Sequence, residues 1–526
     1  MRLHLTPRMA LSERVEAESG GPDDWTFLRR PALLGLIAIV SVCIGASLPS
    51  SPFKLEMAGT WFFGEPGVTD PTQVVLLLPG VVAVYGGMIL FARVWFGLIQ
   101  TLRHRPGAPI RALAGMLALW VVPLLLVAPL FSRDVFSYAA QGEMMSHHIN
   151  PYDYGPGTIG SGQFVGPVDH LWLNTPAPYG PLFLMVDGWF ASLSGHNAIV
   201  TVLFLRFLSV VGVALIAYCI PKLAKAYGRD PGAAFVLAVL NPLTILALIG
   251  GAHNDAIMVG LLLAGITAAK SKHPVVGVIL CTLAAAIKVP AAIGIVYIAW
   301  DWAGAEVDWR QRVRPMVKAA LIALAVMVVL SLVTGLGWGW IGNLGTPGTV
   351  RSWMAPATAV GLVISGAFHL VGVNVGLGGV LTVTRALGLL GAAAIAGYCL
   401  LQSQRLGVLR ALGISLLAFV LLGPVVQPWY LTWGIILMAP VVSGRLRAFV
   451  LGISIVAPFI GLTGGAQLLT QLLHTNPASM VLAVLVLWGL VIMPLGSWTT
   501  SWRLDTTRLA SALPASHPTS PALESS

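Results

Sequence analysis

The chain has 526 residues, of which 57% are hydrophobic and only 10% are charged. A soluble domain of average composition carries about 25% charged residues, so 30 Lys and Arg with 20 Asp and Glu cannot cover a water-soluble chain of this length. Because the apolar residues fall in repeated runs of membrane-spanning length, composition excludes a soluble enzyme and a disordered scaffold and indicates a polytopic membrane protein. The net charge of +10 lies in the membrane part and its short loops, which fits topology and contact with membrane lipids rather than nucleic acid.

The first elements set the orientation of the chain. Residues 1–30 are polar and predict a disordered cytoplasmic tail, and Arg29 and Arg30 mark its junction with the membrane. Short loops rich in Lys and Arg stay in the cytoplasm. The first three spans are therefore expected to alternate between the two sides, at about 31–49, 74–100 and 110–130. The loop 50–73 is then outside, and the long segment 131–180 is an outer loop.

Later loops continue this alternation. Five basic loops are predicted in the cytoplasm, at 222–230, 270–273, 309–315, 404–410 and 444–447. The intervening segments then face outside: 250–255, 286–290, 337–353, 423–430 and the loop near His474. We expect about fourteen spans in a single membrane domain over 31–497, with both termini in the cytoplasm. Two apolar pieces, 181–194 and 357–371, predict re-entrant or interfacial helices on the outer face, and residues 498–526 predict a disordered cytoplasmic C-terminal tail.

Ionisable residues within or beside these spans gather on the outer face. Such residues are rare in membranes and indicate functional sites. They are Asp134, His253, Asp255, Lys288 and Arg351 at outer ends or loops, with Arg206 and Arg385 about two turns inside. A carboxylate can act as a general base, Lys and Arg can bind phosphate, and the neighbouring aromatic rings could stack on sugars. The combination suggests transfer of a group from a lipid phosphate to an outer-face acceptor.

Each of these features also has a structural interpretation. Arg133 and Asp134 could form an ion pair that fixes the loop. The segment 253–255 could cap the following helix, and Lys288 could merely extend to the interface. His147-His148 resembles half of a metal site, but no further ligand follows at a matching spacing, so no metal site is predicted.

Specific motifs carry a family resemblance. The segment FSRDVFSYAAQG (131–142) resembles the actinobacterial α-(1→6)-mannopyranosyltransferases of the MptA/MptB type, which are polyprenyl-phosphate-mannose-dependent enzymes of the GT-C class. The resemblance covers roughly residues 30–495 and continues in order through NPY (150–152), TPAPYGPLF (175–183), GGAHNDAIMVG (250–260), AAAIKVPAA (284–292), GWGW (337–340) and QPWYLTW (427–433). TPAPYGPLF and GTPGTVRSW (345–353) favour the MptB branch.

The resemblance implies an all-α GT-C membrane fold in the plasma membrane, with an extracytoplasmic active site that includes the loop 131–180. The implied donor is mannose on a polyprenyl monophosphate, and the implied acceptor is the growing mannan backbone of lipomannan and lipoarabinomannan. In this class an acidic residue of an early outer loop is the catalytic base, and Asp134 matches that position. Because the donor is β-linked, an α product implies inversion, which needs one base. A polyprenyl phosphate leaves readily, so no metal or other cofactor is expected.

Combining both routes gives a set of hypothetical roles. Asp134 deprotonates the 6-hydroxyl of the acceptor, and Arg133 orients it. The candidates for binding the donor phosphate are Lys288, Arg351, His253 and Arg206, and those for sugar contacts are Asn254, Asp255, Tyr179, Gln427, Trp429 and Tyr430. Two alternatives remain open. One is a GT-C transferase for another lipid-linked sugar, such as arabinofuranose, and the other is a lipid or sugar transporter with polar groups near the membrane midplane.

Overall fold

Helices form all the regular elements of the described part of the chain, which contains no β-strand. This computed structural model describes residues 25–48, 51, 53, 74–304, 307–460 and 462. The expectations for the N-terminal tail up to residue 24, for most of the loop 50–73, for the loop near His474 and for the C-terminal tail lie outside these residues. The all-α prediction is confirmed for the rest.

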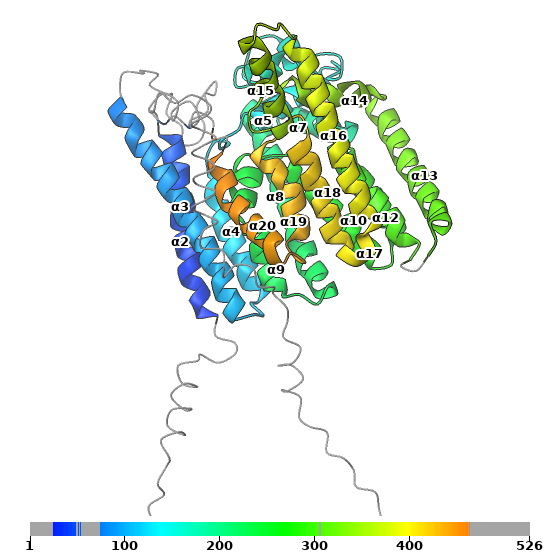
Figure 1. Cartoon of the computed structure of the whole chain (residues 1–526). Helices are drawn as coiled ribbons and strands as arrows, with labels where there is room; N and C mark the ends of the chain where they lie inside the picture. The colour runs from blue at the N-terminus through cyan, green and yellow to red at the C-terminus, as the bar shows by residue number, and fades with distance from the viewer. Residues whose placement is uncertain are drawn as a thin grey trace, which may run out of the picture.

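The first helices match the predicted spans closely. The short η1 (Thr26–Leu28) leads into α2 (Arg29–Ser47), and α3 (Val74–His104) and α4 (Ile110–Leu126) follow. Apolar runs bounded by basic residues or prolines account for these limits, since Pro109 precedes α4 and Arg103 and His104 close α3. Figure 1 shows α2, α3 and α4 side by side at one edge of the helix bundle.

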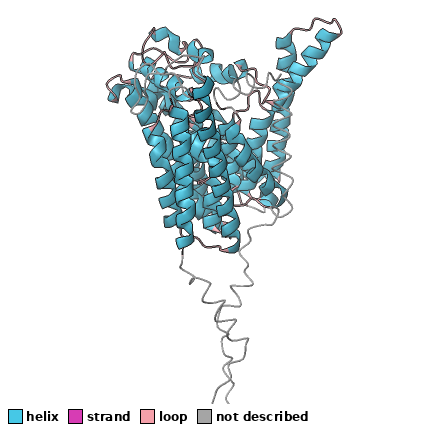
Figure 2. Cartoon of the chain, turned by 90° about the vertical axis from the view of Figure 1, so that its left-hand side faces the viewer, coloured by secondary structure: helices cyan, strands magenta, loops and turns pink. Residues whose placement is uncertain are grey.

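A layer of shorter elements follows α4. It consists of α5 (Asp134–Ser146), η2 (Pro156–Ile159), α6 (His170–Leu173) and α7 (Pro181–Leu193). Most residues of α5 are buried, and α5 contacts both α7 and α8. In Figures 1 and 2 these short helices and their connecting loops lie at the upper end of the bundle, above the long helices. With 13 residues, α7 is too short to cross a bilayer of about 30 Å at 1.5 Å per residue.

The central helices contain two breaks. They are α8 (Ala198–Ala226), α9 (Pro231–Ala238), η3 (Thr244–Gly250), α10 (Asp255–Lys270), α11 (Pro274–Ala285), η4 (Val289–Ala292), α12 (Ile293–Trp302) and α13 (Trp309–Thr334). The chain bends by 114° between η3, a π-helix, and α10. A second break separates α11 from α12 at η4. Both breaks fall on motifs with ionisable residues.

The C-terminal part of the described chain completes the bundle. It contains α14 (Gly339–Gly342), η5 (Asn343–Thr349), α15 (Pro356–Leu370), α16 (Leu377–Leu401), α17 (Ser403–Leu406), α18 (Val408–Leu422), η6 (Pro428–Leu431), α19 (Thr432–Met438), α20 (Gly444–Val456) and η7 (Ala457–Phe459). Helix α13 stands at the edge opposite α2, and α16 lies between it and α18 (Figure 1). Only 11% of the most apolar window of each of these two helices is buried within the protein. Such exposed apolar faces fit contact with lipid.

Five of the described helices are long and apolar enough to cross a membrane, or six if the bent pair counts as one span. They are α2 with η1, α3 from Pro79 onward, α8, α13 and α16. The described chain also contains six shorter apolar helices of 10–17 residues, α7 and α15 included. The chain is thus a membrane protein with several spans, whereas the total of about fourteen remains a prediction.

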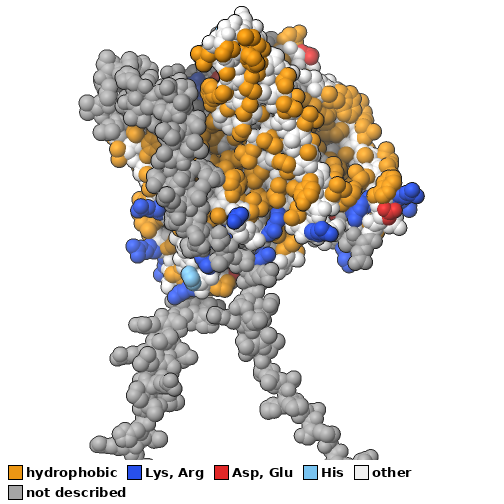
Figure 3. Space-filling model, viewed as in Figure 1, with side chains coloured by type: hydrophobic (Ala, Val, Ile, Leu, Met, Phe, Trp, Pro, Cys, Tyr) orange, Lys and Arg blue, Asp and Glu red, His pale blue; other side chains and the backbone are white. Residues whose placement is uncertain are grey.

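Charge separates the two ends of the bundle. Figure 3 shows Lys and Arg side chains along the lower rim and a wide hydrophobic surface above them. The basic loops 222–230 and 404–410 adjoin α9 and α17, which Figure 1 places at this lower end. The separation agrees with the alternation expected from loop charge.

Candidate active site

Asp134 opens α5 at the upper end of the bundle. Its backbone N–H donates to Ser132 Oγ at 3.2 Å, and the preceding Phe131 has a positive φ of 63° that turns the chain sharply. The N–H of Leu130 donates to the carbonyl of Gly250 at 2.8 Å. A carboxylate in the first helical turn interacts favourably with the helix dipole. The loop before α5 is therefore held against the end of η3. This contact fixes the position of Asp134 at the start of α5.

The corner between η3 and α10 brings His253 to Asp134. Gly251 is required there, because an added Cβ would lie 2.7 Å from the carbonyl oxygen of Ala247 and 2.8 Å from the His253 ring. Ala252 takes a positive φ of 54°. As a result, Nδ1 of the buried His253 lies 3.6 Å from Oδ2 of Asp134. The imidazole therefore lies beside this carboxylate, at a distance longer than a hydrogen bond.

The segment 427–433 supplies an aromatic wall. The Trp429 ring stacks on His253 with centroids 3.9 Å apart and an angle of 18° between the planes. Tyr430 stacks on Trp433 at 4.7 Å, and it meets Trp429 edge-on at 5.9 Å. Aromatic faces of this kind both orient an imidazole and offer surfaces for sugar rings.

Lys288 and Asp255 form a buried ion pair beside this wall. Lys288 Nζ lies 2.9 Å from both carboxylate oxygens of Asp255, and the Trp433 indole N–H donates to Oδ1 of the same group at 2.6 Å. Nζ also lies 4.4 Å from the centre of the Tyr430 ring, within cation–π range. The side chains of Asp255 and Lys288 are 0% and 11% exposed. Lys288 therefore points into the protein and not toward an interface.

Backbone hydrogen bonds place Tyr179 next to Lys288. The N–H groups of Gly180 and Leu182 donate to the carbonyls of Ile287 and Ala286 at 3.0 and 3.1 Å. A Cβ at Gly180 would lie 2.2 Å from the Ala286 carbonyl oxygen, so this approach requires glycine. The Tyr179 ring then lies 5.9 Å from Lys288 Nζ.

The environment of Asp134 changes its acidity. Its side chain is 20% exposed. Burial raises the pKa of Asp134 to about 7, and the nearby Asp255 carboxylate adds to the rise while Lys288 opposes it. A carboxyl group with a pKa near neutrality can accept a proton from a hydroxyl and remain ionised for part of the time at neutral pH. The arrangement is thus suited to general-base chemistry.

Several buried polar atoms in this region have no hydrogen-bond partner within the described chain. They are Nδ1 of His253, both amide atoms of Asn254, the indole N–H of Trp429 and the hydroxyl of Tyr138. Native proteins pair nearly all buried polar atoms, so such a group needs an explanation. The cavity bordered by His253 and Trp429 has a volume of about 30 Å³, which is about the volume of one water molecule. This cavity has room for water.

Comparisons with known proteins identify the family of the chain. The family profile of the α-(1→6)-mannopyranosyltransferase N-terminal domain matches residues 32–304, and that of the MptB C-terminal domain matches residues 357–493. The chain belongs to the MptA/MptB family of α-(1→6)-mannopyranosyltransferases. It is therefore a membrane glycosyltransferase. The match to the C-terminal profile supports the MptB branch.

Individual relatives extend over most of the chain. An α-(1→6)-mannopyranosyltransferase of Mycobacterium tuberculosis is 33% identical over 536 residues, which cover 88% of this chain and 87% of the relative. α-(1→6)-Mannopyranosyltransferase A of the same organism is 32% identical over 79% of this chain and 81% of the relative. α-(1→6)-Mannopyranosyltransferase B of Corynebacterium glutamicum is 34% identical over 63% of this chain and 58% of the relative. No solved structure matches the chain.

Not all of the residues expected from the family motifs meet at this centre. Arg206 is fully buried, and its guanidinium donates to the carbonyls of Leu124, Val127 and Gly250. It therefore holds the end of α4 and the end of η3 together, and its expected contact with the donor phosphate stays a prediction. Arg351 is exposed in the loop before α15, and nothing in the described contacts brings it to Asp134.

Two further expectations concern the residues next to the carboxylate and the aromatic wall. Arg133 precedes α5, but it forms no ion pair with Asp134, so neither the expected ion pair nor a direct orienting contact is present between these two described residues. His253 occupies that place instead. Gln427 precedes η6 beside the aromatic wall and is partly buried.

Sequence reasoning missed Trp433 and Tyr138. Trp433 lies in the 427–433 motif and binds the Asp255 carboxylate directly. Tyr138 follows Asp134 by four residues on α5, the spacing that places side chains on one helix face, and its ring meets Tyr179 at 5.1 Å. The helical spacing could have identified Tyr138, whereas the Trp433 contact spans 178 residues of sequence.

One group of His and Glu side chains in the described residues is close enough to share a metal ion, and it lies elsewhere. This group consists of Glu143, His147 and His196. Asp134 and its neighbours do not belong to it.

Proposed function

We propose that the protein transfers mannose from a polyprenyl monophosphate to the growing α-(1→6)-mannan of lipomannan and lipoarabinomannan, on the extracytoplasmic side of the plasma membrane and with inversion. The relatives named α-(1→6)-mannopyranosyltransferases, at 32–34% identity, support the sugar and the linkage. The polyprenyl donor, the acceptor pathway and a GT-C architecture of about fourteen spans follow from the motif resemblance.

The observation that carries the proposal is the set of unpartnered polar atoms around a buried carboxylate. A glycosyl substrate offers several hydroxyl groups, each both a donor and an acceptor, and so can satisfy the Asn254 amide and the Trp429 and Tyr138 donors. The stacked rings of Trp429 and His253 add an apolar face for a sugar ring. A transporter substrate would be expected to meet polar groups along a path across the membrane, whereas these groups lie together at one end of the bundle.

The chemistry needs one base at the acceptor and stabilisation at the phosphate. Asp134 takes the proton of the acceptor 6-hydroxyl, whose oxygen attacks the anomeric carbon as the bond to the polyprenyl phosphate breaks. His253 lies 3.6 Å from the carboxylate and lines the site beside the base. Asp255 occupies two of the three N–H donors of Lys288, so one donor remains for a phosphate oxygen. We expect the transfer step to need no metal, because the leaving group is already a stabilised anion.

An asparagine at position 134 tests the base. Asp134→Asn keeps the size of the side chain and removes its basicity, so we expect transfer to fall by about 100-fold or more. The assay uses purified full-length protein, labelled polyprenyl-phosphate mannose and a synthetic α-(1→6)-mannoside acceptor. The control is Asp153→Asn, which changes an exposed carboxylate of the same loop region and should retain near-normal activity. Near-normal transfer by a correctly folded Asp134→Asn protein would remove Asp134 from this role.

The donor sugar is tested separately with the unmodified protein. Labelled polyprenyl-phosphate mannose should give a product that an α-(1→6)-specific mannosidase degrades. Incorporation from a polyprenyl-phosphate arabinofuranose donor, with none from the mannose donor, would reject mannose while leaving a glycosyltransferase. If membranes that contain the active protein incorporate neither mannose nor arabinofuranose from these donors, transfer from this class of lipid donor would be rejected.

A further inference from the structure

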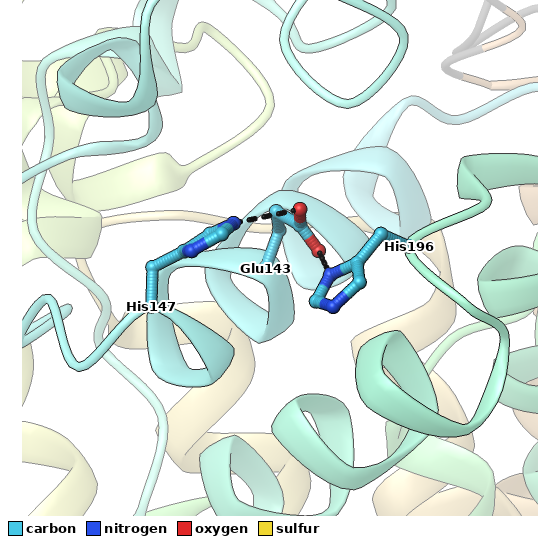
Figure 4. Close-up of side chains that lie close together, drawn as sticks. All are labelled: Glu143, His147 and His196. Carbon is cyan, nitrogen blue, oxygen red and sulfur yellow. Dashed lines mark hydrogen bonds and ion pairs between the residues drawn. The ribbon is translucent and has the colours of Figure 1, made fainter.

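Glu143 lies between two imidazole rings at the far end of α5 (Figure 4). His147 Nε2 is 3.1 Å from one carboxylate oxygen, and His196 Nδ1 is 2.9 Å from the other. The three ligand atoms lie within 4.8 Å of one another. The carboxylate is mostly buried, with 11% of its side chain exposed, while the two imidazoles are about half exposed. None of these residues contributes to the candidate active site.

Two separate segments build this cluster. Glu143 and His147 are four residues apart, so the last turn of α5 places them on one face. His196 comes from the connection between α7 and α8, where Gly195 and His196 take consecutive positive φ values of 65° and 60°. The left-handed conformation is unfavourable for a residue with a Cβ and persists where surrounding contacts require it. Gln163 fixes this turn by donating to the His196 carbonyl at 2.8 Å.

The donor set has the chemistry of a transition-metal site. Two imidazole nitrogens and one carboxylate oxygen form the His₂Glu combination that binds zinc with a fourth position open. Metal–ligand bonds of about 2.0–2.1 Å in a tetrahedron separate neighbouring ligand atoms by about 3.3 Å. The nitrogen–oxygen distances of 3.1 and 2.9 Å run to the two different oxygens of the Glu143 carboxylate, and the three ligand atoms lie within 4.8 Å of one another, which is the size of such a site. A small rotation of the exposed imidazoles completes the geometry.

The surroundings leave room for a fourth ligand. The three side chains border a cavity of about 610 Å³, which Ile159 and the segment 161–165 also line. Water can therefore reach an ion at this position. Borderline divalent ions such as Zn²⁺ fit nitrogen and oxygen ligands of this kind, whereas Ca²⁺ and Mg²⁺ prefer oxygen alone.

We propose that Glu143, His147 and His196 bind one divalent transition-metal ion of the Zn²⁺ class, which clamps the C-terminal end of α5 to the α7–α8 connection. Asp134 lies nine residues before Glu143 on the same helix, about 13.5 Å away at 1.5 Å per residue. The ion is therefore outside the reacting centre, and the site is compatible with a transfer step that uses no metal. This proposal does not depend on the sugar or the lipid donor.

The direct test measures metal content. Purified full-length protein is stripped with a chelator, incubated with ZnCl₂ or CoCl₂, freed of unbound metal and analysed by elemental mass spectrometry. We expect about one metal ion per chain for the unmodified protein and at least a tenfold weaker affinity for His196→Ala and Glu143→Gln. The matched control is His148→Ala, which removes an exposed imidazole next to the site and should leave the stoichiometry unchanged.

Two further measurements separate a metal site from a simple cluster of charges. Bound Co²⁺ should show the visible absorption of nitrogen and oxygen coordination, and Zn²⁺ should raise the melting temperature of the unmodified protein and of His148→Ala but not of His196→Ala. If His196→Ala unfolds, His147→Ala serves as the second variant, because it alters only the end of α5. A stoichiometry near zero, or an equal loss of metal in His148→Ala, would overturn the proposal.

Discussion

The proposed base Asp134 predicts a defined pH dependence for the transfer reaction. Its pKa is raised to about 7, and a general base works only in its deprotonated form. The protonated, inactive form therefore predominates below pH 7. We expect kcat/KM to fall about tenfold for each pH unit below that value and to level off above it. Rate measurements between pH 5 and 9 on purified protein check this, and a profile that stays flat down to pH 5 would contradict it.

The Lys288–Asp255 pair shows what sequence reasoning can and cannot reach at the scale of residues. Each residue stood out because charge is rare inside a membrane protein. Their partnership could not be predicted, because they are 33 residues apart. Asp255 begins α10, whereas Lys288 lies in the break between α11 and η4. The same limit applies to His253, which replaces Arg133 beside Asp134. Residue type identified the candidates, and only the fold assigned their partners.

At the scale of elements, the crossing of α8 and α10 depends on glycine. An added Cβ at Gly212 would lie 2.3 Å from the Ala256 carbonyl carbon, and one at Gly260 would lie 2.7 Å from the Gly212 carbonyl oxygen. Small residues allow such close approach of helices in membranes. Because Asp255 begins α10, a displaced crossing also moves the ion pair with Lys288.

Gly212→Ala is therefore expected to destabilise the protein by about 1–3 kcal/mol, as overpacking does. The control is Gly115→Ala on α4, where a Cβ would meet nothing within 4 Å and where alanine favours the helix. Thermal unfolding in detergent compares the two variants. Equal melting temperatures for both would show that α8 and α10 can separate without cost.

Helix limits were predicted well where hydropathy determines them. The expected spans at about 31–49 and 74–100 correspond to α2 and α3, and the third expected span begins at the same residue as α4. Hydropathy could not predict the 114° bend or the π-helix η3. The average hydropathy of a sequence segment carries no information about a tertiary contact such as the one between Leu130 and Gly250. The metal-site candidate was missed for a similar reason. His147 and His196 are separated by a whole helix, and sequence spacing showed only the pair His147-His148.

For the whole molecule, the segregation of charge predicts which end faces the cytoplasm. All four native cysteines are buried, so a version with these replaced and one new cysteine added allows a clean test. Ser161→Cys lies in the exposed loop after η2, and Ser271→Cys lies in the exposed turn between α10 and α11. In right-side-out vesicles, a membrane-impermeant maleimide should label only position 161. Labelling of position 271 alone would reverse the proposed orientation.

The backbone link between Gly180 and Ile287 has a consequence for how such an enzyme can diversify. The hydrogen bonds that hold the 175–183 motif against the 284–292 motif use main-chain atoms only. A substitution at Tyr179 would therefore change the surface offered to a sugar while leaving the attachment of Lys288 intact. The side chain proposed to contact the sugar and the backbone bonds that position Lys288 can therefore change independently. Single substitutions at Tyr179 could then produce new acceptor preferences while Lys288 keeps its position.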